Sequence, residues 1–439
     1  MTDPSLYQRP VELAQKLIRF NTSNPPGNEG ECIAFIADLL ASVGIESQIY
    51  GKDPERPNLV ARIAGRGQAA PLMLYGHVDV VTTTDQPWQH DPFGGQLIDG
   101  YVWGRGALDM KGEVAMFLAA FIRAHVEQAS LPGDVILCIL SDEEAGSEYG
   151  AGYLVEEYPN LFDGVRYALG EFGGFSFYLN GKRFYPIMVA EKQHCWMRLR
   201  VTGPARHASI PLRGGAMERL SQVLADLTTK RLPIHVTPVA RLMIEALARE
   251  LGGLQGLALH QLLNPTLAQA LLNLLSESQR RIFEPLLRNT ATPTILHSGE
   301  LINVLPSEVR LELDCRLLPG MTLDEFMAEL RELIGGEVEI KVGRFQPGPP
   351  EADMALYDTL ASLLREADPE GIPIPLMLPG VTDGRIFSRL GIQTYGFTPL
   401  KLPPNFDFIA TIHAPDERVP AEAIEFGSSV LYNALQRFK

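Results

Sequence analysis

The chain has 439 residues, more than one hydrophobic core usually organises, so we expect two or more domains. It carries 38 lysines and arginines against 53 aspartates and glutamates, a formal net charge of −15. This acidity disfavours nucleic acid as a partner, because phosphate binding needs a basic patch. The first ten residues, MTDPSLYQRP, lack the apolar centre of a signal peptide, and no apolar run reaches membrane-spanning length. We therefore expect a cytoplasmic protein that makes no membrane contact.

The N-terminal region predicts two amphipathic helices, over 11–19 and 31–43, with the turn-rich segment NTSNPPGNEG between them. Strands and helices then alternate to about residue 190, which is typical of a mostly parallel sheet with flanking helices. The four cysteines are far apart and lack metal-site spacing, so we expect them to be reduced and mostly buried. They are Cys32, Cys138, Cys195 and Cys315.

The segment Leu72–Val81, LMLYGHVDVV, is an apolar run that ends in glycine, His77 and, one residue later, Asp79. It predicts a buried strand, and ligands of α/β proteins bind just past the carboxyl ends of such strands. Imidazole is the commonest metal ligand, and its other ring nitrogen usually donates to a carboxylate. His77 and Asp79 can therefore supply a metal ligand and the group that orients it.

Further metal-capable residues follow the same pattern along the chain. Asp109 lies between the glycine-rich GRGALDMKG and a predicted helix over 114–124. Buried strands are predicted over 134–140 and 165–169. Glu143 and Glu144 follow the first of these strands and Glu171 follows the second, while His413 opens a loop near the C-terminus.

Two histidines, a bridging carboxylate and two terminal carboxylates make a two-metal site with nitrogen and oxygen ligands. Such a site suits Zn²⁺, with Mn²⁺ and Co²⁺ as alternatives. Paired ions share a water and clamp both oxygens of a displacement. A hydrolase also needs a proton shuttle, and one of the adjacent glutamates Glu143 and Glu144 can serve while the other binds metal.

Taken together, these motifs resemble the co-catalytic zinc metallopeptidases, a family that includes aminoacylase, carboxypeptidase G, succinyl-diaminopimelate desuccinylase and the carnosine dipeptidases. The resemblance covers nearly the whole chain. The motifs that carry it are GHVDVV, DGYVWGRGALDMKG, SDEEAGSEYGA, ALGEFGG and TIHAPDERV. The resemblance implies that Glu143 is the general base and that Asp79 orients His77. It also implies that the metal ligands are His77, Asp109 (which bridges the metals), Glu144, Glu171 and His413.

The resemblance extends into a second domain through VTGPARHASIPLRGGA and NVLPSEVRLELDCRLLPG. It implies that His207 reaches the active site of a partner subunit and stabilises the oxyanion, so we expect a homodimer. Asn303 and Arg385 match substrate-binding positions. Arg385 suits a substrate carboxylate, since its planar fork pairs bidentately.

ALGEFGG lacks the Glu-Pro of many relatives and is similar to the carboxypeptidase-S-like branch, which includes enzymes that act on N-fatty-acyl amino acids. The Leu-rich stretch Pro238–Leu287 points to the same branch. Its leucines are most simply core or a dimer face, with a lipid pocket as the alternative. Two further acids have open interpretations: Asp142 as a loop acid that caps the following helix, and Glu417 as a group that orients His413 or faces solvent.

The predicted fold class is α/β and zinc-exopeptidase-like, with an inserted α+β lid or dimerisation domain. Residues 195–201 and 308–317 alternate with period two, which predicts antiparallel strands, and 217–227 predicts a helix. We expect the lid domain over 192–346 and the catalytic domain over 1–191 and 347–439.

The predicted function is two-metal hydrolysis of an amide bond in a dipeptide or N-acyl amino acid that carries a free carboxylate. One alternative is an N-acyl, including fatty-acyl, amino-acid deacylase or synthase. The other is a non-catalytic binding protein on the same fold, because a fold does not fix function.

Overall fold

A computed structural model of the chain describes residues 3–210, 213–335 and 338–439. The chain divides into two compact units. Met1–Val189, Asp353–Leu376 and Thr382–Lys439 form the first unit, and Ala190–Ala352 with Met377–Val381 form the second. Residues 211–212, within the predicted lid motif that carries His207, lie outside the described part of the chain.

A large mixed sheet organises the first unit. Its strands follow the order β1 (Ser47–Tyr50), β2 (Asn58–Ile63), β6 (Val135–Leu140), β3 (Leu72–His77), β7 (Tyr167–Gly170), β17 (Gln393–Gly396), β9 (Lys182–Glu191) and β16 (Gly371–Leu378), and β8 (Phe177–Leu179) pairs with β9. The central strands β6, β3, β7 and β17 run parallel to one another. Every residue of β3 and β6 is buried, which explains why both read as continuous apolar runs. The predicted α/β fold is confirmed.

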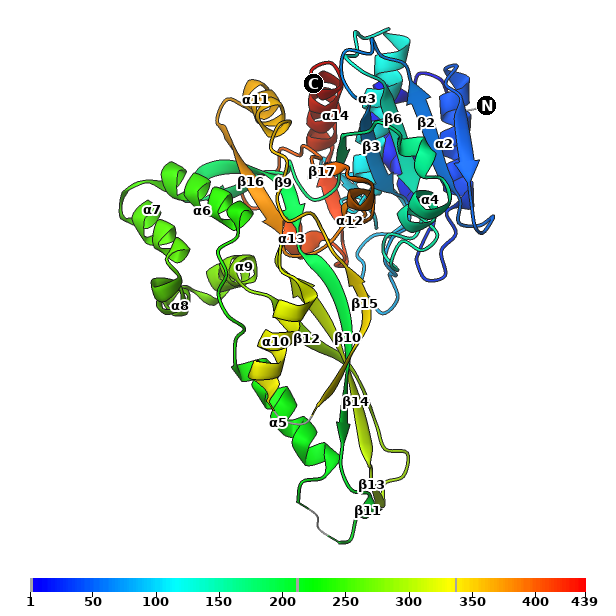
Figure 1. Cartoon of the computed structure of the whole chain (residues 1–439). Coiled ribbons are helices and arrows are strands. Elements are labelled where there is room, and N and C mark those ends of the chain that lie inside the picture. Colours follow the sequence, from blue (N-terminus) through cyan, green and yellow to red (C-terminus); the bar gives the residue numbers. More distant parts are fainter. Residues whose placement is uncertain (1–2, 211–212, 336–337) are drawn as a thin grey trace. The chain divides into compact units, whose positions relative to one another are not determined.

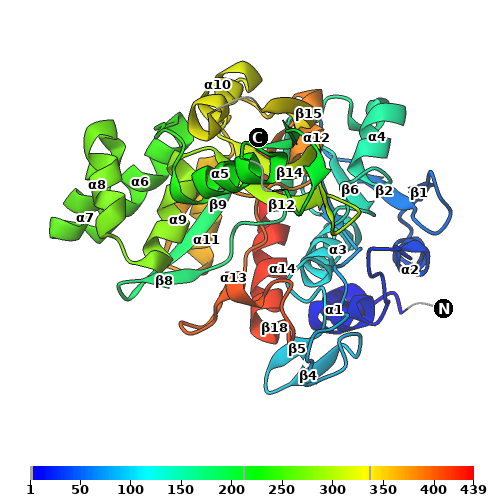
Figure 2. The same ribbon diagram turned by 90° about the horizontal axis from the view of Figure 1, so that it is seen from below.

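Helices cover both faces of this sheet (Figure 2). On one side lie α3 (Lys111–Val126) and α14 (Ala421–Leu435), and on the other α4 (Ala151–Glu157) and α12 (Gly384–Phe387), which share a core with β3 and β6. The predicted N-terminal helices are confirmed as α1 (Pro10–Ile18), which packs on α3, and α2 (Gly30–Ser42), which packs on β1 and β2. This unit also contains α11 (Tyr357–Ala367), α13 (Phe408–Thr411) and a small sheet of β18 (Arg418–Pro420), β5 (Tyr101–Trp103) and β4 (Gln96–Ile98).

The second unit contains an antiparallel sheet of β12 (Thr290–Ser298), β14 (Glu308–Leu317), β10 (Gln193–Thr202) and β15 (Glu339–Gln346). The period-two strands predicted from the sequence are thus confirmed as β10 and β14. Their apolar residues face α5 (Ala216–Thr229) and α10 (Leu323–Ile334), which lie along one side of the sheet (Figure 1). A short ribbon of β11 (Arg206–His207) and β13 (Val304–Leu305) lies at one end of the sheet.

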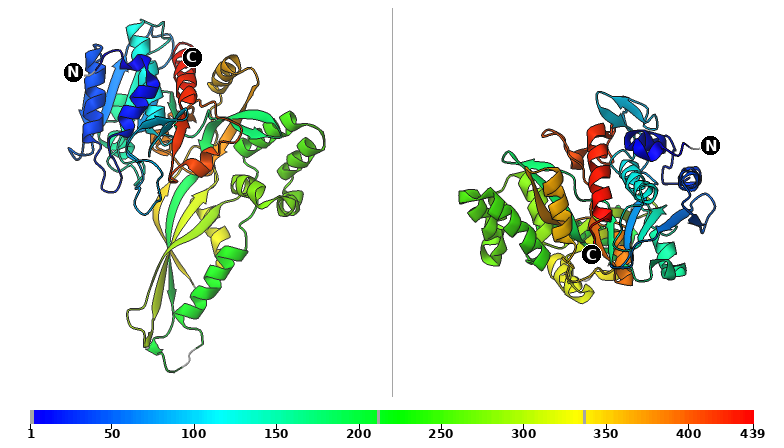
Figure 3. Two further views of the ribbon diagram at one scale, coloured as in Figure 1. Left: turned by 180° about the vertical axis from the view of Figure 1, so that it is seen from behind. Right: turned by 90° about the horizontal axis from the view of Figure 1, so that it is seen from above.

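The Leu-rich insert, drawn in green in Figures 1 and 3, contains the α-helices α6 (Pro238–Leu251), α7 (Gly253–His260), α8 (Pro265–Leu274) and α9 (Glu277–Leu287). Helices α6 and α8 begin with proline at the first turn, and each has a side-chain cap, from Thr237 and Asn264. Some leucines of the insert are buried, whereas Leu254 and Leu274 are 85% and 82% exposed. The dimer-face and lipid-pocket interpretations of this insert remain predictions.

All four cysteines are free and buried, as predicted. Across the described residues, none of the helices combines the length and the apolar character that a membrane crossing would need.

Candidate metal and catalytic centre

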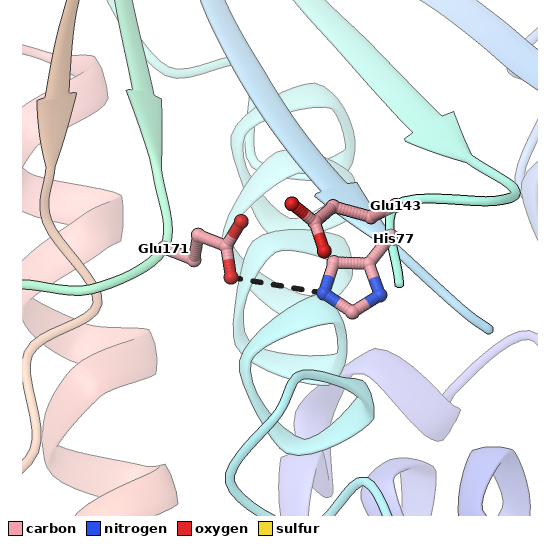
Figure 4. Close-up of side chains that lie close together, drawn as sticks. All are labelled: His77, Glu143 and Glu171. Carbon is pink, nitrogen blue, oxygen red and sulfur yellow. Dashed lines mark ion pairs between the residues drawn. The ribbon is translucent and has the colours of Figure 1, made fainter. Parts of the chain in front are cut away.

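Three neighbouring strands bring the predicted ligands to one edge of the first unit's sheet. His77 is the last residue of β3, Glu171 directly follows β7, and Glu143 and Glu144 are the third and fourth residues after β6. Because these strands are parallel, their carboxyl ends meet at the same edge. Figure 4 shows the side chains of His77, Glu143 and Glu171 converging there from three separate elements.

The Asp109 carboxylate lies between the two histidines. Its Oδ1 is 3.1 Å from His77 Nε2, and its Oδ2 is 3.1 Å from His413 Nε2. Glu171 Oε2 lies 3.7 Å from the same His77 nitrogen, and Glu144 Oε1 lies 3.1 Å from the same His413 nitrogen. The five predicted ligands therefore form two groups of side chains, one around each histidine, that share Asp109.

Asp79 contacts both His77 and the backbone of Glu143 and Glu144. Its backbone oxygen is 3.0 Å, and its carboxylate oxygen 3.3 Å, from His77 Nδ1, the ring nitrogen that faces away from Asp109. The same carboxylate accepts hydrogen bonds from the backbone N–H groups of Glu143 and Glu144, both at 3.1 Å. Asp79 therefore fixes the imidazole ring and the start of the glutamate loop together.

Glu417 holds the loop that carries Asp109. Its carboxylate is fully buried and accepts from the backbone N–H groups of Leu108 at 2.8 Å and Asp109 at 3.2 Å. Arg105, also buried, pairs with it at 2.5 Å and donates to the backbone oxygen of His413 at 3.1 Å. The solvent-facing interpretation of Glu417 is wrong, because this carboxylate anchors the bridging aspartate.

The surrounding carboxylates raise the pKa of both histidines. Burial opposes protonation of His77, but hydrogen bonds to Asp109, Asp79 and Glu171 outweigh it and raise its pKa well above the ordinary value. At His413 the same balance, with Asp109 and Glu144 as acceptors, raises the pKa to about 10. Burial also opposes ionisation of Asp109, yet hydrogen bonds from both histidines hold its pKa below the ordinary range.

The pKa values of the other three carboxylates, those of Glu143, Glu144 and Glu171, are raised. Burial raises the pKa of Glu171 to about 7, although its hydrogen bond to His77 lowers it in part. Burial and then repulsion from Glu171 raise the pKa of Glu143 well above its ordinary value, and burial with repulsion from Asp109 raises that of Glu144. Buried carboxylates of this kind are paired or bind cations. Two imidazoles and a surplus of carboxylates form a donor set that fits divalent metal ions.

Arg385 lies beside this centre, on α12. Its buried guanidinium donates to the backbone oxygen of Thr382 at 2.5 Å and to Ser147 Oγ at 3.1 Å. Its Nη1 lies 3.6 Å from Glu143 Oε1. Ser147 in turn donates to Asp383 Oδ1 at 2.5 Å, so one hydroxyl links the arginine and the aspartate. Sequence reasoning did not assign Ser147 a role, although it lies inside the quoted SDEEAGSEYGA motif.

His207 and Asn303 belong to the second unit. His207 lies on β11, exposed, with Nδ1 2.7 Å from Ser209 Oγ. Asn303 directly precedes β13, and its backbone oxygen accepts from Ala208 N at 2.9 Å. The structure thus brings these two residues to one exposed ribbon, while the seven residues from His77 to His413 that were predicted as ligands, base and orienting group gather in the first unit.

The interpretation of Asp142 as a simple loop acid needs correction. It lies in the predicted loop but is 2% exposed, and its carboxylate pairs with Arg56 at 2.9 Å. It also accepts from Asn24 Nδ2 at 3.1 Å and from Tyr149 N at 3.0 Å. Nothing in the local sequence indicates these partners, because Arg56 and Asn24 precede Asp142 by more than eighty residues.

Comparison with known proteins decides the family. The family model described as peptidase family M20/M25/M40 matches residues 73–437. The chain belongs to this family. It is accordingly a metal-dependent hydrolase, and the matched region includes all of the predicted site residues, from His77 to His413.

Curated relatives and solved structures agree with this assignment. The chain is 28% identical to the N-fatty-acyl-amino acid synthase/hydrolase of Mus musculus, over 83% of this chain and 74% of the relative. It is 24% identical to human aminoacylase-1, over 93% and 90%. The fold is similar to that of an M20 family metallo-carboxypeptidase from Sulfolobus solfataricus, with a TM-score of 0.71, 16% identity and 99% of both chains covered.

Proposed function

We propose that the enzyme uses two divalent cations to hydrolyse an amide bond in an N-acyl amino acid or dipeptide that carries a free carboxylate. The observation that carries this proposal is the Asp109 carboxylate, with one histidine at each oxygen and a further glutamate beside each histidine. His77, Asp109 and Glu171 would hold one ion, and Asp109, Glu144 and His413 the other. Zinc is the proposed metal, with Mn²⁺ and Co²⁺ as alternatives.

When bound, such ions polarise the amide carbonyl and make water a nucleophile near neutral pH. Glu143 is the proposed general base. Its carboxylate lies within 4.8 Å of ligand atoms of His77 and Glu171, a group that could itself hold a cation, whereas Glu144 contacts His413 at 3.1 Å. It takes a proton from the attacking water and returns it to the leaving amine. Asp79 contacts both the His77 ring and the backbone N–H of Glu143, so it holds the two in fixed relative positions.

Arg385 is the proposed anchor for the substrate carboxylate. Hydrogen bonds to Thr382 and Ser147 fix the orientation of its guanidinium, which lies 3.6 Å from the proposed base Glu143. A bidentate pair with a carboxylate fixes both the distance and the plane of the bound group. Asn303 is the proposed second substrate contact.

The acyl side of the substrate distinguishes the two candidate substrate classes. The names of the relatives, an N-fatty-acyl-amino acid synthase/hydrolase and an aminoacylase, favour an N-acyl amino acid over a dipeptide. We further propose a homodimer in which His207 donates to the oxyanion at the partner's site. A cytoplasmic location is proposed because four free, buried cysteines fit a reducing compartment.

The test is a hydrolysis panel. Apo-protein reconstituted with Zn²⁺, Mn²⁺ or Co²⁺ is assayed with dipeptides and with N-acetyl and N-fatty-acyl amino acids, and amine release is measured. We expect turnover of the N-acyl amino acids, and loss of turnover when the metal is removed. A metal-loaded dimer that hydrolyses none of these amides would contradict the proposal.

A further inference from the structure

A buried polar network behind the metal centre contains two residues with no assigned role. Asn24 and Arg56 both contact Asp142, which immediately precedes the proposed base Glu143. Neither residue is among the proposed ligands, and both are buried. We call Asn24, Arg56 and Asp142 the loop anchor.

Asp142 is where the chain leaves β6 and turns toward the metal centre. Its φ is +67°, a left-handed conformation that non-glycine residues rarely adopt and that its surroundings must hold in place. Its backbone oxygen accepts from Ser147 N at 2.6 Å, which closes the loop upon itself. The position of Asp142 therefore sets where Glu143 and Glu144 begin.

Arg56 is the cation that compensates the buried acids of this network. It reaches both oxygens of Glu29, at 3.0 and 3.3 Å, and Asp142 Oδ1 at 2.9 Å, and its guanidinium lies over the Tyr149 ring at 4.8 Å. Glu29 is fully buried. A planar fork can serve two carboxylates in this way, whereas a lysine is a point charge.

Asn24 connects Asp142 to Asp79, which contacts the proposed metal ligand His77. Its Nδ2 donates to Asp142 Oδ1 at 3.1 Å and to Asp79 Oδ2 at 2.9 Å. Asp79 receives the N–H groups of Glu143 and Glu144 and orients His77. The Asn24 side-chain amide thus links Asp142, which precedes Glu143, to Asp79, which accepts from the N–H groups of Glu143 and Glu144.

We propose that Asn24 and Arg56 are positioning residues of the hydrolytic centre, which they act on through Asp142 and Asp79. This inference rests on the proposed function. Outer groups that orient metal ligands typically contribute ten- to a hundredfold in metal affinity or activity. A purely structural network would instead change only the stability of the fold.

The experiment compares Asn24→Ala and Arg56→Lys with a matched control, Arg183→Lys. Arg183 also makes an ion pair with a buried carboxylate of the first unit, Asp368, at 2.5 Å, and its further partners, Tyr178 and Glu370, are not residues of the centre described above. Metal-stripped proteins are titrated with Co²⁺ by calorimetry, kcat and KM are measured on the best panel substrate, and the denaturation midpoint is recorded.

We expect both loop-anchor variants to lose about ten- to a hundredfold in Co²⁺ affinity or in kcat, with KM within about threefold of wild type. The control should lower the denaturation midpoint to a similar extent and leave Co²⁺ affinity and kcat unchanged. If Asn24→Ala does not fold, Arg56→Lys carries the same test, because it retains the charge.

Wild-type Co²⁺ affinity and kcat in both loop-anchor variants, with only the midpoint lowered, would overturn the inference. Failure of the proposed function is distinguishable. A wild-type protein that binds two Co²⁺ ions but turns over no amide refutes that function, and the affinity comparison still decides the role of the loop anchor.

Discussion

At the residue scale, Glu143 and Glu144 are adjacent in the chain yet face different groups. Glu144 Oε1 lies 3.1 Å from His413 Nε2, whereas Glu143 Oε1 lies 3.6 Å from Arg385. Neighbouring residues in a loop point in different directions, so two adjacent acids can take one metal-binding and one proton-transfer role. The contacts of each side chain decide which role it takes.

Replacing each glutamate separates these roles. Glu143→Ala should retain two metal ions per chain and lose turnover by at least about a hundredfold, the low end of general acid–base contributions. Glu144→Ala should lose one ion as well. Metal content by elemental analysis, beside kcat, checks both outcomes. Loss of metal from Glu143→Ala alone would mean that the two roles are reversed.

Arg385 predicts a requirement for a free substrate carboxylate. C-terminal amides of good substrates should be turned over poorly, because the guanidinium would lose its charged partner. Arg385→Lys should raise KM for the carboxylate substrate, since an ammonium cannot form the bidentate pair. The measurement is kcat and KM for matched acid and amide substrates, and equal values for the pair would rule out this anchor.

At the element scale, the connection between β9 and β10 contains a buried lysine. Lys192 is 1% exposed and donates to the backbone oxygen of Arg288, directly after α9, at 2.7 Å. Burial, and then the charge of Arg316, lower its pKa to about 7 from an ordinary value of 10.5. The ammonium therefore ties the Leu-rich insert to the sheet of the second unit at an electrostatic cost.

The sign of the resulting pH dependence follows from linkage. Between pH 7 and 10.5 the folded state binds fewer protons at Lys192 than the unfolded state, so the free energy of unfolding rises with pH in this window. The cost of the buried charge is fully present below pH 7. Relative to Lys192→Met, the wild type should gain about 2 kcal/mol between pH 7.5 and 9.5, since one pKa unit corresponds to about 1.4 kcal/mol.

Urea denaturation of wild type and Lys192→Met at both pH values, in the presence of a chelator, measures this difference. The chelator removes any contribution from metal binding. Parallel pH profiles of the two proteins would show that Lys192 keeps an ordinary pKa in the folded state.

At the scale of the whole molecule, the site residues are divided between two units. The residues proposed as metal ligands and as the base lie in the first unit, and His207 and Asn303 lie on an exposed ribbon of the second. The proposed homodimer gives this division a function, because a histidine from one chain can complete the centre of another.

Mixing two inactive variants tests this arrangement. His207→Ala should keep its metal ions and lose turnover by roughly a hundred- to a thousandfold, the scale of a lost oxyanion donor. If His207 acts across the interface, a mixed dimer with Glu143→Ala has one site with both lesions and one intact site. Up to half of the activity of that species should return. No recovery after demonstrated subunit exchange would place His207 in its own chain's site or outside catalysis.

The sequence by itself determined the fold class and the residues that we propose as metal ligands. Continuous apolar runs specified β3 and β6, the period-two pattern specified β10 and β14, and a residue at the end of a parallel strand can only lie at the ligand-binding edge. His77, Glu143, Glu144 and Glu171 follow from that rule. Their identity as one site with Asp109 and His413 came from the family resemblance.

Only the tertiary structure decided how the centre is held. Glu417, Asp142, Asn24 and Arg56 look like ordinary loop residues in the sequence, yet all are buried and each bonds to a segment far away in the chain. A buried polar group must find a partner, but the partner's place in the sequence is set by how distant strands and loops pack. Local periodicity carries no information about that choice, so the supporting network became visible only when the chain was folded.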